Sequence, residues 1–124
     1  MRARILMIED NEQNRYLATF LLEDYGFEVK HAADGPAGLE LAGSELFDLI
    51  LLDIQLPLMD GHAVARALRA NPALSRVPIV AVTSYAMAGD RELAMAAGCN
   101  GYLEKPIDPD TFVADVARYL SREV

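Results

Sequence analysis

The sequence has one cysteine, no tryptophan and no run of basic residues. The single cysteine, Cys99, excludes a disulfide within the chain and any metal site built from several cysteines, which suits a reducing compartment. We expect Cys99 to be a small buried side chain. Eleven Lys and Arg against nineteen Asp and Glu give a formal net charge of −8. This negative charge repels phosphates, so we expect no nucleic acid or anionic membrane as a partner.

Long apolar runs are missing as well. The most apolar stretch, Leu49–Leu52, is far shorter than the roughly 20 residues that cross a bilayer. No signal-peptide pattern precedes the first apolar residues after Met1. The 124 residues, 52% of them hydrophobic, are enough for one domain with its own core. We therefore expect a single soluble, cytoplasmic domain over residues 1–124, and nothing in the sequence requires more than a monomer.

Short apolar runs alternate with amphipathic stretches along the whole chain. The runs predict strands over residues 5–8, 27–31, 49–52, 77–82 and 101–103, and the stretches between them predict helices over 11–24, 35–43, 60–70, 86–97 and 108–122. In the first helix, Leu17, Phe20 and Leu21 form the expected inward face. Five strands and five helices in strict alternation predict an α/β fold with a doubly wound parallel sheet.

Polar residues follow four of these strands at their carboxyl ends, where ligands bind in open parallel sheets. We expect three carboxylates, one hydroxyl and one ammonium to meet at this edge. The strand ends that supply these groups are Glu9-Asp10 after the first strand, Asp53 after the third, Thr83-Ser84 after the fourth and Glu104-Lys105-Pro106 after the fifth.

Carboxylates that meet at one edge repel one another unless a cation lies between them. Hard oxygen ligands favour Mg²⁺, which also recruits phosphate oxygens. Asp53 can in addition attack phosphorus and carry an acyl phosphate, with Lys105 and Thr83 near the phosphate oxygens. Taken singly, each residue has a plainer explanation. Asp10 can cap a helix, Lys105 can be a solvated lysine and Thr83 can simply favour a strand.

Four segments resemble the receiver domain of bacterial two-component response regulators. They are Ile8–Asn11, Leu51–Gly61, Ala81–Ser84 and Tyr102–Pro106. The resemblance covers essentially the whole chain and implies a single-domain, CheY-like (βα)5 fold with strand order 2-1-3-4-5. The chain is more particularly similar to cell-division response regulators of the DivK type in Asp53–Met59, Tyr85–Asp90 and Gly98-Cys99.

The resemblance also implies a role for each acidic residue. Asp53 is the expected phosphoacceptor, and its donor is a phosphohistidine on a histidine kinase or phosphotransfer protein. Asp10 and Asp53 are expected to ligate Mg²⁺ directly, together with the backbone carbonyl of Gln55. Glu9 is expected to act mainly through a metal-bound water.

Further residues are implied in phosphate binding and switching. Lys105 is expected to pair with Asp53 or its phosphate, and the bond between Lys105 and Pro106 to be cis. Thr83 is expected to move onto a phosphate oxygen while Tyr102 turns inward. The Ser84 hydroxyl either adds a phosphate contact or caps the next turn. Gln55 and Tyr85 flank the path of attacking water and are predicted to tune phosphate lifetime, unless both are simply exposed loop residues.

The resemblance places two partner surfaces on the chain. Donor docking is expected near Gln13, Asn14 and Leu17 of the first helix, although Leu17 is first of all a candidate core residue. A downstream target is expected on the surface of the fourth helix, fifth strand and fifth helix, near Tyr102 and Tyr119. The two histidines, His31 and His62, are expected to be solvated.

Other functions remain open from the sequence. The receiver could pass phosphate onward in a relay. A phosphatase of the haloacid dehalogenase type also uses a strand-end Asp, but it needs a second Asp where this chain has Gln55. A flavodoxin-like or dinucleotide-binding protein needs a phosphate loop after the first strand, where this chain has Glu9–Glu12. A receiver that acts without phosphorylation is expected to lack Asp10, Asp53 or Lys105, and all three are present.

Overall fold

The structure is a computed structural model that describes residues 2–84 and 88–121. Its centre is a parallel sheet of five strands in the order β2-β1-β3-β4-β5. Both the α/β class and this strand order confirm the prediction. The strands are β1 (Arg4–Ile8), β2 (Glu28–Ala32), β3 (Leu49–Asp53), β4 (Ile79–Thr83) and β5 (Gly101–Glu104).

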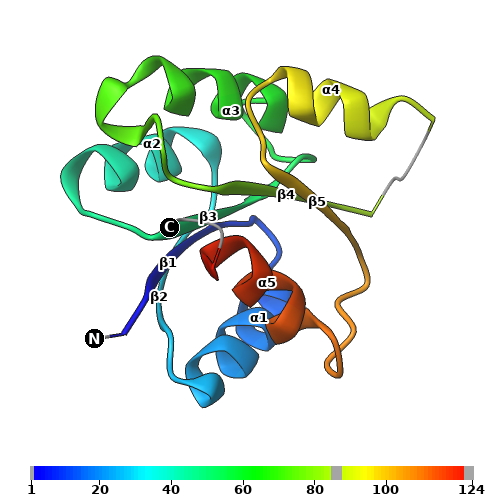
Figure 1. Cartoon of the computed structure of the whole chain (residues 1–124). Helices are drawn as coiled ribbons and strands as arrows, with labels where there is room; N and C mark the ends of the chain where they lie inside the picture. Colours follow the sequence, from blue (N-terminus) through cyan, green and yellow to red (C-terminus); the bar gives the residue numbers. More distant parts are fainter. Residues whose placement is uncertain (1, 85–87, 122–124) are drawn as a thin grey trace.

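Helices cover both faces of the sheet (Figure 1). One face carries α2 (Gly35–Ser44), α3 (Gly61–Ala70) and α4 (Asp90–Ala96), and the other carries α1 (Glu12–Tyr25) and α5 (Phe112–Ser121). A short 3-10 helix, η1 (Pro72–Leu74), follows α3 and was not predicted from the sequence.

The two helix layers enclose two hydrophobic clusters, one on each face of the sheet. All five residues of β3 and all five of β4 are buried, as expected for strands that are covered on both faces. Ile8 of β1 pairs with Leu52 of β3, and Asp53 pairs with Val82 of β4. This register brings the carboxyl ends of the three central strands to one edge of the sheet.

Side chains cap the helices that leave this edge. Asn11, Asp34 and Asp60 each accept a hydrogen bond from a backbone N–H in the first turn of α1, α2 and α3. Gly26 ends α1 in the left-handed conformation, with φ 113°. These caps explain why the bounds of α1, α2 and α3 lie within one residue of the predicted ones.

Two helices begin later than predicted. The sequence pattern predicts a helix over 86–97, but α4 begins at Asp90 because Gly89 has the left-handed conformation, with φ 90°. The predicted residues 86 and 87 lie outside the described part of the chain. The pattern also predicts a helix over 108–122, but α5 begins at Phe112. A turn precedes it, in which the Asp108 carboxylate accepts from the N–H of Asp110.

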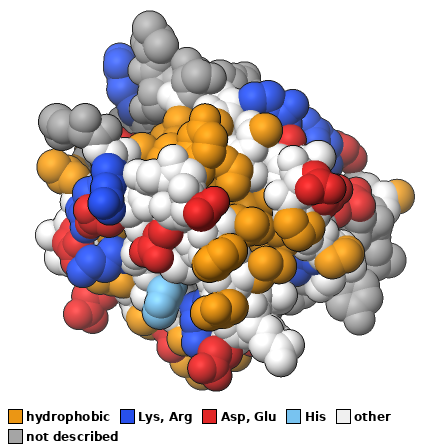
Figure 2. Space-filling view, turned by 90° about the horizontal axis from the view of Figure 1, so that it is seen from below, with side chains coloured by type: hydrophobic (Ala, Val, Ile, Leu, Met, Phe, Trp, Pro, Cys, Tyr) orange, Lys and Arg blue, Asp and Glu red, His pale blue; other side chains and the backbone are white. Residues whose placement is uncertain are grey.

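The inward face of α1 also differs from the prediction. Ala18 and Leu22 are fully buried, whereas Phe20 is 58% exposed, so the prediction was wrong for Phe20. The small side chain of Ala18 faces the sheet, and a residue two positions further along a helix points to the opposite side. Figure 2 looks onto the face of α1 and α5 and shows hydrophobic side chains gathered there in a band.

Candidate functional site

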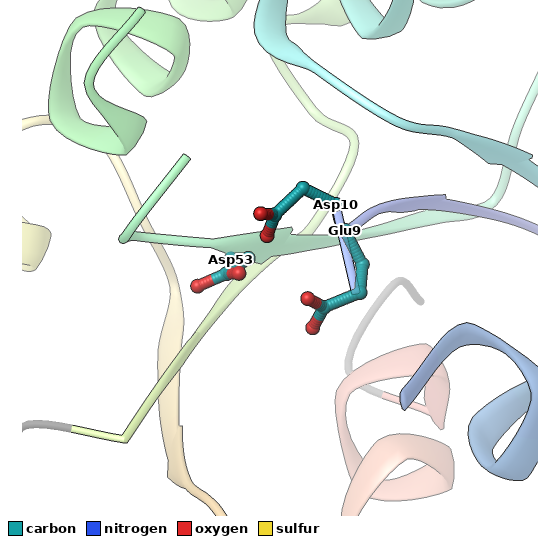
Figure 3. Close-up of side chains that lie close together, drawn as sticks. All are labelled: Glu9, Asp10 and Asp53. Atoms are coloured by element: carbon teal, nitrogen blue, oxygen red, sulfur yellow. The ribbon is translucent and has the colours of Figure 1, made fainter. Parts of the chain in front are cut away.

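Three carboxylates meet at the carboxyl end of the sheet. The ligand atoms of Glu9, Asp10 and Asp53 lie within 4.8 Å of one another, and the three side chains face a common space (Figure 3). Glu9 and Asp53 are buried, with 5% and 3% of their surface exposed, while Asp10 is exposed. The predicted convergence of strand-end acids is therefore present in the folded chain.

Local contacts hold the acidic loop after β1 in place. The Arg15 guanidinium on α1 donates to the carbonyl oxygens of Glu9 and Asp10, at 2.8 and 3.1 Å. The N–H of Asn11 donates to the Glu9 carboxylate at 3.1 Å. The role of Arg15 was not predicted, since an arginine on a polar helix face gives no signal of which backbone it contacts.

Lys105 provides the positive charge that faces these acids. Its Nζ lies 2.6 Å from Glu9 Oε1 and 3.3 Å from Asp53 Oδ2, and only 10% of its side chain is exposed. The pairing with Asp53 was predicted, but the shorter contact with Glu9 was not. The backbone N–H of Lys105 donates to the carbonyl of Thr83 at 2.7 Å, and the bond to Pro106 is cis.

Among the described residues the charges at this edge do not balance, because Lys105 pairs with Glu9 and Asp53 and a third carboxylate, Asp10, lies within 4.8 Å of theirs. Burial, and then the charge of Glu9, raises the pKa of Asp53 to about 7. The N–H of Gln55, which donates to Asp53 Oδ1 at 2.9 Å, and the Lys105 ammonium both oppose this rise. At neutral pH the site therefore holds a carboxylate that a further cation would stabilise in its charged form.

The donor set fits a hard divalent cation. Carboxylate oxygens from Asp10 and Asp53 are the ligands that Mg²⁺ selects, and the surplus negative charge supplies the attraction. Glu9 is already held by Lys105, so its carboxylate is the least available of the three. The Gln55 carbonyl stays a predicted ligand.

Residues 5–117 match the family described as the response regulator receiver domain. The chain belongs to this family. It is 38% identical over 120 residues to the polar-differentiation response regulator DivK of Brucella anthropi, which covers 97% of this chain and 98% of the relative.

Solved receivers have the same fold. The chemotaxis protein CheY4 of Vibrio cholerae superposes with a TM-score of 0.92 at 30% identity, over 96% of this chain and 99% of that protein. The receiver domain of the sensor histidine kinase PA1611 of Pseudomonas aeruginosa gives a TM-score of 0.89 at 36% identity, over 98% and 99% of the two chains. That structure has a magnesium ion in its active-site cleft.

Gln55 links the loop after β3 to the residues at the end of β4. Its side-chain amide donates from Nε2 to Thr83 Oγ1 at 2.7 Å. Its Oε1 accepts from the Ser84 N–H at 3.3 Å and from the Ser84 hydroxyl at 3.4 Å. All three residues are candidates from the sequence, but these contacts were not predicted. They depend on side-chain conformations that a sequence pattern does not specify.

The predicted switch tyrosine lies beside β4. Tyr102 on β5 is half-buried and packs against the hydrophobic cluster under α2, α3 and α4. Its hydroxyl is buried, without a hydrogen-bond partner among residues 2–84 and 88–121. Burial, followed by the charge of Asp90, raises the pKa of this hydroxyl.

The remaining predicted residues are placed as follows. Gln13 is exposed, and Asn14 and Leu17 are half-buried on α1. Tyr119 on α5 lies against Gly101 of β5, where an added Cβ atom would overlap its ring.

Cys99 is buried as expected, and burial raises its pKa to about 11. Tyr85 lies outside the described residues.

The two histidines differ from each other. His31 is exposed, as predicted. For His62 the prediction was wrong, because only 19% of its side chain is exposed and its Nδ1 lies 3.5 Å from Asp60 Oδ1. The position of His62 in the first turn of α3, next to the capping Asp60, accounts for this contact.

Gly61 is a structural requirement of the site, although no role was predicted for it. A Cβ atom at this position would lie 2.5 Å from the Cα of Ile54 and 2.7 Å from the carbonyl oxygen of Asp53. Only glycine allows the start of α3 to lie this close to the backbone that follows the central aspartate.

None of the helices within residues 2–84 and 88–121 has the length and hydrophobicity needed to cross a membrane.

Proposed function

We propose that this chain is a cytoplasmic response regulator receiver that accepts a phosphoryl group on Asp53. The donor is a phosphohistidine on a histidine kinase or a phosphotransfer protein, and the reaction depends on Mg²⁺. The observation that carries this proposal is the position of Asp53. It is a buried carboxylate at the end of the central strand, within 4.8 Å of two further acids and 3.3 Å from an ammonium group.

The transfer forms one bond and breaks one. A carboxylate oxygen of Asp53 attacks phosphorus, and the bond between phosphorus and the donor imidazole nitrogen breaks. The imidazole keeps the electron pair of that bond. A ring protonated on its other nitrogen leaves as neutral imidazole, and an unprotonated ring takes one proton from solvent. The product is an acyl phosphate, whose oxygens need positive charge and hydrogen-bond donors nearby.

This chain offers such groups around Asp53. Lys105 lies 3.3 Å from Asp53 Oδ2 and is close enough to pair with a phosphate oxygen after transfer. Thr83 is buried, and Ser84 presents a backbone N–H and a hydroxyl beside it. When bound by Asp10 and Asp53, Mg²⁺ supplies further positive charge for the phosphate oxygens.

Loss of the phosphoryl group needs only water. Water attacks phosphorus, the bond to the Asp53 oxygen breaks, and inorganic phosphate leaves. The chain then catalyses only its own phosphorylation and slow dephosphorylation. A phosphatase with turnover would need a general acid two residues after Asp53. Gln55 occupies that position, and its amide is bonded to Thr83 and Ser84.

The output of the receiver is a change of its protein-binding surface. Thr83 and Tyr102 lie on neighbouring strands, with Thr83 paired to Glu104 and Ala81 paired to Tyr102. A shift of Thr83 toward a phosphate therefore acts beside Tyr102 and the surface of α4, β5 and α5. A downstream protein target on this surface, with Tyr102 and Tyr119 near it, completes the proposal.

The similarity to DivK suggests the process. The relatives carry the name polar-differentiation response regulator, and we propose a role in cell-cycle or cell-division control for this chain. Reception of phosphate for output and its onward transfer in a relay are both compatible with the same site.

The proposal is tested by intact mass spectrometry after incubation with acetyl phosphate and Mg²⁺. Asp53→Asn and a sample with EDTA are the controls. We expect one phosphoryl adduct that needs both Mg²⁺ and Asp53. No adduct on folded protein, or an adduct that persists in Asp53→Asn, contradicts the proposal. Fast release of phosphate over many turnovers, with no adduct accumulating, would instead support the phosphatase alternative.

A further inference from the structure

The side chain of Gln55 connects the loop after β3 to the end of β4 directly beside Asp53. Its amide contacts the Thr83 hydroxyl, the Ser84 N–H and the Ser84 hydroxyl, at 2.7, 3.3 and 3.4 Å. Its own backbone N–H donates to Asp53 Oδ1 at 2.9 Å. One residue therefore touches the nucleophile with its backbone and the predicted switch residue with its side chain.

The orientation of this amide follows from the chemistry of its partners. The backbone N–H of Ser84 can only donate, so the group that faces it must be the amide oxygen. The amide nitrogen then faces Thr83, whose hydroxyl oxygen accepts the hydrogen bond. The opposite orientation would place two N–H donors against each other.

A phosphoryl group on Asp53 needs some of the same donors. A hydroxyl can accept from Gln55 and still donate its proton to a phosphate oxygen, so Thr83 alone does not force a choice. The Ser84 N–H has a single proton, and in this structure that proton is directed at Gln55 Oε1. Binding of a phosphate oxygen by this N–H therefore requires the hydrogen bond from Ser84 to Gln55 Oε1 to break.

We propose that the Gln55 side-chain amide is a latch, which holds Thr83 and Ser84 in the unphosphorylated arrangement and so weakens phosphoryl binding at Asp53. Gln55 is a positioning residue in this scheme, since its side chain acts on the donors of the phosphate oxygens. The inference rests on the proposed function and adds a form of regulation to the same site.

The size of the effect follows from the hydrogen bonds involved. An exposed side-chain amide regains hydrogen bonds to water when it leaves its partners, and each exchanged hydrogen bond then has a small net effect. Removal of the latch is expected to strengthen binding of a phosphate mimic about 3-fold to 10-fold.

The test compares Gln55→Met with the unchanged chain. Methionine keeps the length of the side chain and removes the amide. Ala70→Met, at the exposed far end of α3, is the matched control for an added methionine. The measurement is the dissociation constant of beryllofluoride in the presence of Mg²⁺, by isothermal titration calorimetry, together with the melting temperature of each protein without ligand.

We expect Gln55→Met to bind beryllofluoride about 3-fold to 10-fold more tightly, with a melting temperature close to that of the unchanged chain. Ala70→Met should bind as the unchanged chain does. Equal or weaker binding by Gln55→Met overturns the latch. If the unchanged chain binds no beryllofluoride and forms no adduct with acetyl phosphate, the proposed function fails and the latch fails with it.

A second measurement follows the latch directly. In the unchanged chain, NMR should show the Gln55 side-chain amide protons and the Ser84 N–H shifting together when beryllofluoride is added. The amide protons should then exchange faster with solvent. Binding of beryllofluoride that leaves the Gln55 amide resonances in place overturns the latch but leaves phosphorylation of Asp53 intact.

Discussion

The two ends of the sheet differ in how their charged side chains are paired. At the amino end, Arg4 of β1 donates to Glu28 and Glu45 at 2.9 and 2.7 Å and to the carbonyl of Leu46, and its guanidinium lies over the ring of Phe47. At the carboxyl end, Lys105 pairs with Glu9 and Asp53, and Asp10 adds a third carboxylate within 4.8 Å of theirs.

The pKa shifts show the result of this difference. The hydrogen bond from Arg4 lowers the pKa of Glu45, and the bond to Glu45 raises the pKa of Arg4, so each group stabilises the charge of the other. At the carboxyl end, burial and the charge of Glu9 raise the pKa of Asp53 to about 7. The amino end pairs its charges, whereas the carboxyl end keeps a surplus of negative charge at the expense of stability.

Among substitutions at the two ends of the sheet, loss of Lys105 should change the free energy of unfolding most. Lys105→Met leaves Glu9 and Asp53 buried without their ammonium partner. The free energy of unfolding at pH 8 in EDTA should fall by about 3 kcal/mol, and Mg²⁺ should restore part of the loss. Urea denaturation with and without Mg²⁺ measures both changes. An unchanged stability in EDTA would show that the carboxyl end does not depend on this lysine.

Removal of the central charge should act in the opposite direction. Asp53→Asn leaves Lys105 paired with Glu9 and removes the carboxylate with the raised pKa. We expect the free energy of unfolding at pH 8 in EDTA to rise by about 1–2 kcal/mol, and the stabilisation by Mg²⁺ to shrink. A variant that is less stable than the unchanged chain in EDTA contradicts the account.

Asp53→Asn should also remove a pH dependence of the stability of the folded state. Between the ordinary carboxyl pKa of 3.8 and about 7, the folded chain keeps a proton on Asp53 that the unfolded chain has lost. This site therefore makes the folded state less stable as pH rises through that window. In EDTA, melting temperatures measured across the window should show this contribution in the unchanged chain and not in Asp53→Asn.

A substitution at the amino end should change stability least, and the stability that Glu45 contributes there should depend on pH in the opposite direction. Arg4→Met removes the partner of Glu45, whose lowered pKa contributes stability above its ordinary value of 4.5 that is lost as pH falls. The variant should lose less stability at neutral pH than Lys105→Met, and its deficit should shrink in acid. The extent of phosphorylation by acetyl phosphate should stay unchanged. A drop in phosphorylation would mean that the two ends are coupled.

Much of this architecture could be predicted from the sequence. Parallel strands that alternate with helices must bring their carboxyl ends to one edge, so the sequence alone places Glu9, Asp10, Asp53, Thr83 and Lys105 together. The same alternation predicts the sheet. Residues at the ends of buried strands have little freedom in where they lie.

Features that depend on side-chain conformation or on helix rotation could not be predicted in this way. The contact between Lys105 and Glu9, the bridge from Gln55 to Thr83 and the anchoring of the acidic loop by Arg15 all require known rotamers. Phe20 was misplaced because a stripe of large apolar residues suggested an inward face, whereas the small Ala18 lies against the sheet.

The most direct test of the central claim is the identity of the phosphorylated residue. The unchanged chain is incubated with acetyl phosphate and Mg²⁺, treated with borohydride, which reduces an aspartyl phosphate to homoserine, and digested for peptide mass mapping. The account predicts homoserine at position 53 and at no other aspartate. Homoserine at Asp10 or at another carboxylate, with Asp53 unchanged, would contradict it.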